Sequence, residues 1–79
     1  MGFAKSEAEI AERTARFVKA ELKRAGVTYD ELAERLKDHG LSETRNSIAA
    51  KLKRGTFAAT WFIAVLAALE LNGVRLEDL

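Results

Sequence analysis

The chain of 79 residues carries 13 lysines and arginines against 12 aspartates and glutamates, a net charge of +1, and it contains no cysteine. A chain of this length forms one domain near the lower size limit for a single hydrophobic core, so we expect one domain over residues 1–79. The absence of cysteine excludes disulfides and thiolate metal sites, and a hydrophobic fraction of 48% is ample for a folded globule.

The first predicted helix covers residues 7–25, because its apolar residues recur with helical periodicity. Its predicted inner face consists of Ile10, Thr14, Phe17, Val18, Leu22 and Ala25. Two glutamate–arginine pairs lie one helical turn apart on the charged face: Glu9–Arg13 and Glu12–Arg16. Gly26 follows at the position where a glycine commonly ends a helix.

The second predicted helix covers residues 28–39. Thr28 and Glu31 have the spacing of a capping box, in which a threonine hydroxyl and a glutamate three residues later satisfy free amides at the helix start. Gly40 closes the helix. Its predicted inner face consists of Leu32, Ala33 and Leu36.

The third predicted helix covers residues 43–54, with Ser42 or Thr44 as its cap and Gly55 as its stop. Its predicted inner face consists of Ile48, Ala49 and Leu52. The basic charge of the chain is concentrated around this helix, because residues 35–54 hold six cations and two anions. The cations are Arg35, Lys37, Arg45, Lys51, Lys53 and Arg54, and the anions are Asp38 and Glu43.

The fourth predicted helix covers residues 58–71 and is apolar nearly all round, so we expect other elements to cover most of its sides. Its fourteen residues are interrupted by Thr60 and Glu70 and fall short of the roughly 20 that span a bilayer. Asn72 and Gly73 end it, and a short turn over residues 75–79 folds back. The whole pattern predicts an all-α fold, a compact orthogonal bundle of four to five short helices.

Three strings of this sequence occur in the order typical of a known superfamily. They are VTYDELAERL at residues 27–36, LKRG at 52–55 and ALELNGVRLEDL at 68–79. Together they resemble the λ-repressor and Cro-like helix-turn-helix superfamily over about residues 17–79. One departure is the insertion of residues 37–39 before Gly40, which leaves about six residues more than usual between Leu32 and Gly55. The resemblance therefore implies a helix-turn-helix fold in which helix two is a turn longer or the connection to helix three is an extended loop.

The resemblance also implies that the third helix reads duplex DNA in a transcriptional regulator. Arg45, Asn46 and Ser47 would then contact base edges, since arginine can donate twice to guanine and asparagine can pair with adenine. The implied phosphate contacts are Tyr29, Lys37, Lys51, Lys53 and Arg54.

The basic residues at the end of the third helix also have an explanation without DNA. Cations in the last turn interact favourably with the helix dipole, by about 0.3–1 kcal/mol each. Glu43 on the proposed DNA face would repel phosphate. The alternative function is therefore a protein-interaction module on the same helical scaffold, which does not bind DNA.

Trp61 is open to two interpretations at this stage. Small domains use every large side chain in the core, which favours a buried Trp61. In the other interpretation, Trp61 and Val65 form an exposed apolar strip, and such strips usually mark protein interfaces. A homodimer through this surface would suit a DNA-binding protein that needs two half-sites.

The sequence holds little that indicates catalysis. His39 is the only histidine and has no second ligand or nucleophile at a recognisable spacing, and the isolated glycines form no phosphate-binding loop. We therefore expect no enzyme activity, metal, cofactor or small-molecule substrate. No signal peptide is evident, so we expect a cytoplasmic protein. The string SIAAKLKRGTF at residues 47–57 also resembles a family of short bacterial domains, but that resemblance implies no activity.

Overall fold

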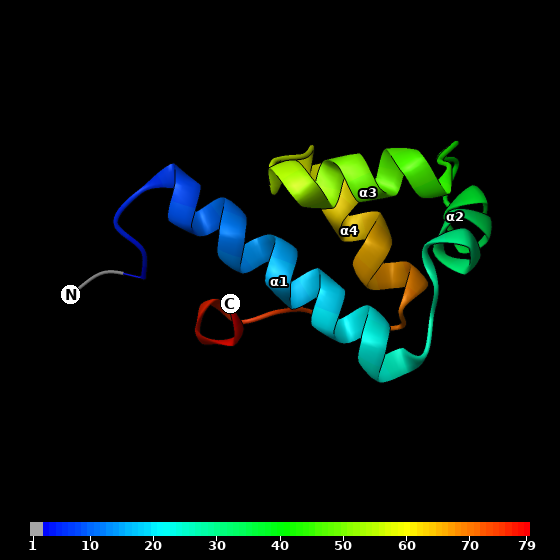
Figure 1. Ribbon diagram of the computed structural model, residues 1–79. Helices are drawn as coiled ribbons and strands as arrows, with labels where there is room; N and C mark the ends of the chain where they lie inside the picture. Colours follow the sequence, from blue (N-terminus) through cyan, green and yellow to red (C-terminus); the bar gives the residue numbers. More distant parts are fainter. Residues whose placement is uncertain (1–2) are drawn as a thin grey trace.

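The computed structural model describes residues 3–79, and this part of the chain is all-α (Figure 1). Four α-helices are followed by one turn of 3₁₀ helix: α1 Glu7–Ala25, α2 Tyr29–Lys37, α3 Arg45–Arg54, α4 Ala59–Ala68 and η1 Leu76–Asp78. The Cα radius of gyration is 12.3 Å. The prediction of a small, compact, all-α bundle is confirmed.

The helices pack around α3, which contacts α1 on one side and α2 on the other, while α2 also packs against α4. Figure 1 shows α1 along one edge of the bundle and α2 nearly end-on, at a steep angle to α3. The chain then returns past α4, so that η1 lies beside α1. Among the described helices, none combines the length and apolar character needed to cross a membrane.

The helix ends follow local rules that the sequence makes visible. The side chain of Thr28 accepts a hydrogen bond from the Glu31 amide at 3.1 Å, as predicted, whereas the Glu31 carboxylate binds Arg35 and does not complete the predicted capping box. Thr44, rather than Ser42, caps α3. Gly26 and Gly55 end α1 and α3 in the left-handed conformation, with φ of 71° and 75°, where glycine has no steric penalty.

Three of the predicted helix boundaries are wrong. The α-helical part of α2 ends at Lys37, a hydrogen-bonded turn continues from it and is closed by Gly40 (φ 79°) as predicted, and α3 begins only after its Thr44 cap. Helix α4 ends at Ala68, and not at the predicted residue 71. The reason is Glu70, which adopts a φ of 60° and lets the Leu71 amide donate to the Leu66 carbonyl at 2.9 Å. This closes the helix as a glycine usually would.

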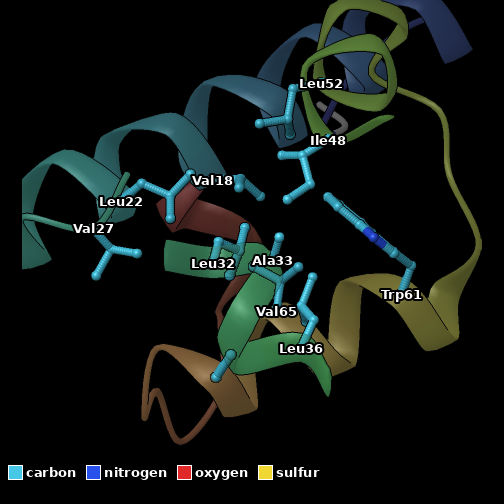
Figure 2. Close-up of a cluster of buried hydrophobic side chains, with 11 residues drawn as sticks. Val18, Leu22, Val27, Leu32, Ala33, Leu36, Ile48, Leu52, Trp61 and Val65 are labelled. Carbon is cyan, nitrogen blue, oxygen red and sulfur yellow. The ribbon is translucent and has the colours of Figure 1, made fainter. Parts of the chain in front are cut away.

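The core forms where all four helices meet, as Figure 2 shows for its main side chains. The largest fully buried side chains are Leu32, Leu36, Ile48, Leu52, Val18 and Val65. Trp61 is only 3% exposed and Val65 is 0% exposed, because both pack into this core between α4 and α3 (Figure 2). The predicted partner surface of Trp61 and Val65 is therefore wrong, and the core interpretation of Trp61 is correct.

Some of the predicted faces also need correction. Ile10 and Ala25 of α1 are exposed, and Ala15 is buried in addition to the predicted Val18 and Leu22, because the contact with α3 falls on the alanine side of α1. Ala49 of α3 is exposed, although it was predicted to face inward. Helix α4 is less covered than predicted, since Ile63 is 62% exposed.

Substitution of Leu52 tests the register of α3. Leu52→Ala should lower the free energy of unfolding by about 2–5 kcal/mol, because it removes a buried side chain that cannot be replaced without leaving a cavity. Urea unfolding followed by circular dichroism measures the change. Leu76→Ala is the matched control: its side chain is exposed, so its effect should stay within about 0.5 kcal/mol. Equal effects of the two variants would contradict the register.

Substitution of Gly55 tests the close approach of α3 to α1. A Cβ atom at this position would lie 2.5 Å from the Ala11 carbonyl oxygen, whereas a Cβ at Gly26 would meet no atom within 4 Å. Both glycines have positive φ, which costs other residues about 1–2 kcal/mol. Gly55→Ala should therefore destabilise the domain by more than Gly26→Ala in the same unfolding experiment. A smaller loss at Gly55 would show that α1 and α3 are less tightly apposed.

Candidate nucleic-acid interface

Helix α3 has one face fixed in the core and one face in solvent. Ile48 and Leu52 are buried against α1 and α2, and this fixes the rotation of the helix about its axis. The opposite face consists of exposed residues: Asn46, Ala49, Ala50 and Lys53. Two small side chains therefore lie at the centre of the exposed face, with polar and basic groups toward its two ends.

Arg45 starts α3 and binds an acid at the start of α2. Its Nε donates to Oδ2 of Asp30 at 3.1 Å, and its Nη2 donates to the same oxygen. The hydrogen bond from Arg45 holds the pKa of the Asp30 carboxyl below its usual range. The contact joins the first turns of α2 and α3 across the loop 38–44.

Ser47, which was predicted to contact base edges, instead forms hydrogen bonds at the start of α3. Its Oγ accepts a hydrogen bond from the Thr44 amide at 2.8 Å and donates to Oε1 of Glu43 at 2.6 Å. The Ser47 amide in turn donates to the Thr44 hydroxyl at 3.1 Å. These contacts form a capping box, so the Ser47 hydroxyl already has partners within the helix start.

Lys51, a predicted phosphate contact, is also engaged within the domain. Its Nζ lies 3.1 Å from Oε1 of Glu43 and 5.9 Å from the centre of the Trp61 ring. The Glu43 side chain is only 8% exposed. The expected repulsion between Glu43 and phosphate therefore does not arise, because the carboxylate is largely buried and bound to a cation.

The other predicted phosphate contacts divide into two groups. Lys37 pairs with Glu34 at 2.9 Å near the end of α2, and Tyr29 is half-buried against the core at the start of α2. Lys53 and Arg54 are exposed at the end of α3, and within the described residues neither has an acidic partner. The Nη2 of Arg54 donates only to the Thr56 carbonyl, at 3.4 Å.

A family model described as a domain of unknown function, DUF6471, matches residues 10–74. The chain belongs to this family. No curated protein and no solved structure matches it. The match includes α2, α3 and α4 complete and nearly all of α1.

The sequence did not reveal that Asp30 binds Arg45 in this DUF6471 domain, or that Glu43, which was expected only to repel phosphate, binds Lys51. Asp30 lies 15 positions before its partner Arg45, and Glu43 lies eight positions before Lys51. Neither spacing matches the three or four residues at which ion pairs form along a helix, and Glu43 lies before the Thr44 cap of α3, so the sequence carries no signal for either pair. The His39 ring lies in the exposed turn after α2, and the described residues contain no group of three metal-ligating side chains.

The largely buried pair of Glu43 and Lys51 should stabilise the fold more than an exposed pair. Glu43→Ala leaves a half-buried lysine without its acid, and breaking such contacts costs about 1–3 kcal/mol. A double-mutant cycle with Lys51→Met, read by urea unfolding, gives the coupling energy. The exposed pair Glu34–Lys37 is the control and should couple by less than about 1 kcal/mol. A coupling no larger than this at Glu43–Lys51 would contradict the assignment.

Proposed function

We propose that this DUF6471 domain binds duplex DNA and places the exposed face of α3 in the major groove. The observation that carries the proposal is the charge of α3: it holds four cations and no acid. The two acids that lie against it, Asp30 and Glu43, are each bound to one of these cations. The carboxylates of Asp30 and Glu43 are therefore both neutralised by cations of α3, and this favours binding of a polyanion such as DNA to its exposed face.

The side chains of the exposed face suit contact with base pairs. Asn46 is exposed near the start of α3, and asparagine pairs bidentately with adenine in the major groove. The methyl groups of Ala49 and Ala50 can approach closely and contact the thymine methyl group. Lys53 and Arg54 would neutralise phosphates, which positions the protein without reading sequence.

The proposal accounts for the long loop between α2 and α3. Groove docking in the helix-turn-helix class depends on the angle between these two helices. Here residues 38–44 separate them, and the ion pair of Arg45 with Asp30 joins their first turns. Leu41 in the loop packs against the core. We propose that these two contacts set the angle between α2 and α3, which a tight turn sets in other helix-turn-helix proteins. A domain that docks in this way would act in transcriptional regulation.

A protein-interaction module is the second candidate function. The observation that favours it is the exposure of two isoleucines, Ile63 on α4 and Ile10 on α1. Exposed apolar side chains that gather on one side mark protein interfaces. The two functions predict different effects of salt, since only a polyanion complex releases counterions on binding.

Fluorescence anisotropy of a labelled random-sequence duplex distinguishes the two candidates. The domain should bind at about 50 mM salt, and the two phosphate contacts of Lys53 and Arg54 should weaken binding by roughly 10-fold at about 200 mM. Lys53→Ala/Arg54→Ala should lower the affinity and the salt dependence together. Arg24→Ala/Arg75→Ala is the control, because it removes the same charge from two exposed arginines outside α3 that are paired with acids. It should change the affinity and the salt dependence much less. Absence of binding at 50 mM salt would overturn the proposal.

A further inference from the structure

A groove of about 480 Å³ lies between α1 and the last turn of α3. Its floor consists of small or buried residues, among them Ala11, Ala15 and Leu52. Four cations line it: Arg16 and Lys19 from α1, and Lys53 and Arg54 from α3. Glu12 is the one acid among the lining residues. Gly55 also lines the groove, and its lack of a side chain lets α3 end directly against α1.

The groove is distinguished by the number of its lysines and arginines that form no ion pair in the part of the chain that the structure describes. Seven of the 13 lysines and arginines form ion pairs with acids within the described residues. The six that do not are Lys5, Arg16, Lys19, Lys23, Lys53 and Arg54. Four of these six line the one groove. Unpaired positive charge is thus concentrated where two helices meet.

The helix dipole cannot account for this concentration. It favours cations only in the last turn of a helix, which applies to Lys53 and Arg54 at the end of α3. Arg16 and Lys19 lie in the middle of α1, which runs from Glu7 to Ala25. The spacing of Glu12 and Arg16 predicted an ion pair along α1, but only Glu9–Arg13 forms. In residues 3–79, Arg16 and Lys19 in the middle of α1 therefore have no ion-pair partner.

We propose that this groove binds the phosphodiester backbone of the duplex whose bases α3 contacts, so that α1 is a second DNA-binding element. The inference rests on the proposed function of α3. Asn46 and Lys53 are seven residues apart, or about 10 Å along the helix axis, and the major groove is about 12 Å wide. With Asn46 at the base edges, the groove between α1 and α3 lies at the phosphates that border the major groove.

The small floor and the basic rim of the groove both suit a phosphate chain. Alanines at the floor leave room for a backbone to enter, and cations from two helices can contact phosphates from both sides. These contacts read no bases, so they should be independent of sequence. The carboxylate of Glu12 lies in the groove and would repel a phosphate there. Removal of its charge should therefore raise the affinity for DNA, whereas removal of the cations should lower it.

The double variant Arg16→Ala/Lys19→Ala tests the inference in the anisotropy experiment. Loss of two phosphate contacts should make the slope of log K against log salt less steep by about 1.8, equally for duplexes of different sequence. Glu12→Gln should raise the affinity. Arg24→Ala/Arg75→Ala, with the same change in net charge, is the control. All three variants alter exposed side chains, so the fold should be retained, which circular dichroism verifies.

The outcomes separate this inference from the proposed function. If Arg16→Ala/Lys19→Ala binds DNA as the unchanged protein does while Lys53→Ala/Arg54→Ala binds less, the groove inference is overturned and α3 remains the DNA-binding element. If the unchanged protein does not bind the duplex, both are overturned.

An NMR titration of the ¹⁵N-labelled domain identifies the source of the phosphate. The duplex should shift the amides of Ala15 and Gly55 together with that of Asn46. Shifts at Ala15 and Gly55 with inorganic tripolyphosphate but not with the duplex would assign the groove to a free phosphate compound and overturn the inference.

Discussion

The burial of Ile48 and Leu52 is the constraint on which the rest of the structure depends. These two residues are one turn apart on α3 and contact a core to which all the other helices contribute. Their burial determines how α3 is rotated, and this rotation determines which of its residues face solvent. The exposure of Asn46, Ala49 and Lys53 is therefore a consequence of hydrophobic packing on the opposite side of the helix.

The charged residues around α3 serve two different purposes. Arg45 and Lys51 are bound to acids and hold the structure: one links α3 to α2, and the other covers the Trp61 ring. Lys53 and Arg54 have no acidic partner in the part of the chain that the structure describes, and they lie exposed at the end of the helix. Residues of one chemical type, within ten positions of the chain, are thus divided between support of the fold and the face proposed to meet DNA.

Much of the fold could be predicted because it is encoded locally. The helices, the Thr28 cap and the glycine stops follow from spacing and from single residues, and Leu32, Leu36 and Leu52 follow from helical periodicity. The end of α4 could not be predicted, since it depends on Glu70 adopting a conformation that usually requires glycine. The ion pairs of Arg45 and Lys51 could not be predicted either, because they depend on where the loop 38–44 places Asp30 and Glu43 relative to α3.

Trp61 is the only tryptophan of the chain, and its place in the core gives the domain an intrinsic optical probe. The indole is buried among residues of the core, packs at a tilt against the Phe57 ring with ring centres 4.7 Å apart, and lies beneath the Lys51 ammonium group. Within the described residues its Nε1 has no hydrogen-bond acceptor. Emission from an indole in such surroundings is blue-shifted and moves to the red when water enters. Any loosening of α3 from α4 can therefore be followed in the unlabelled protein by its own fluorescence.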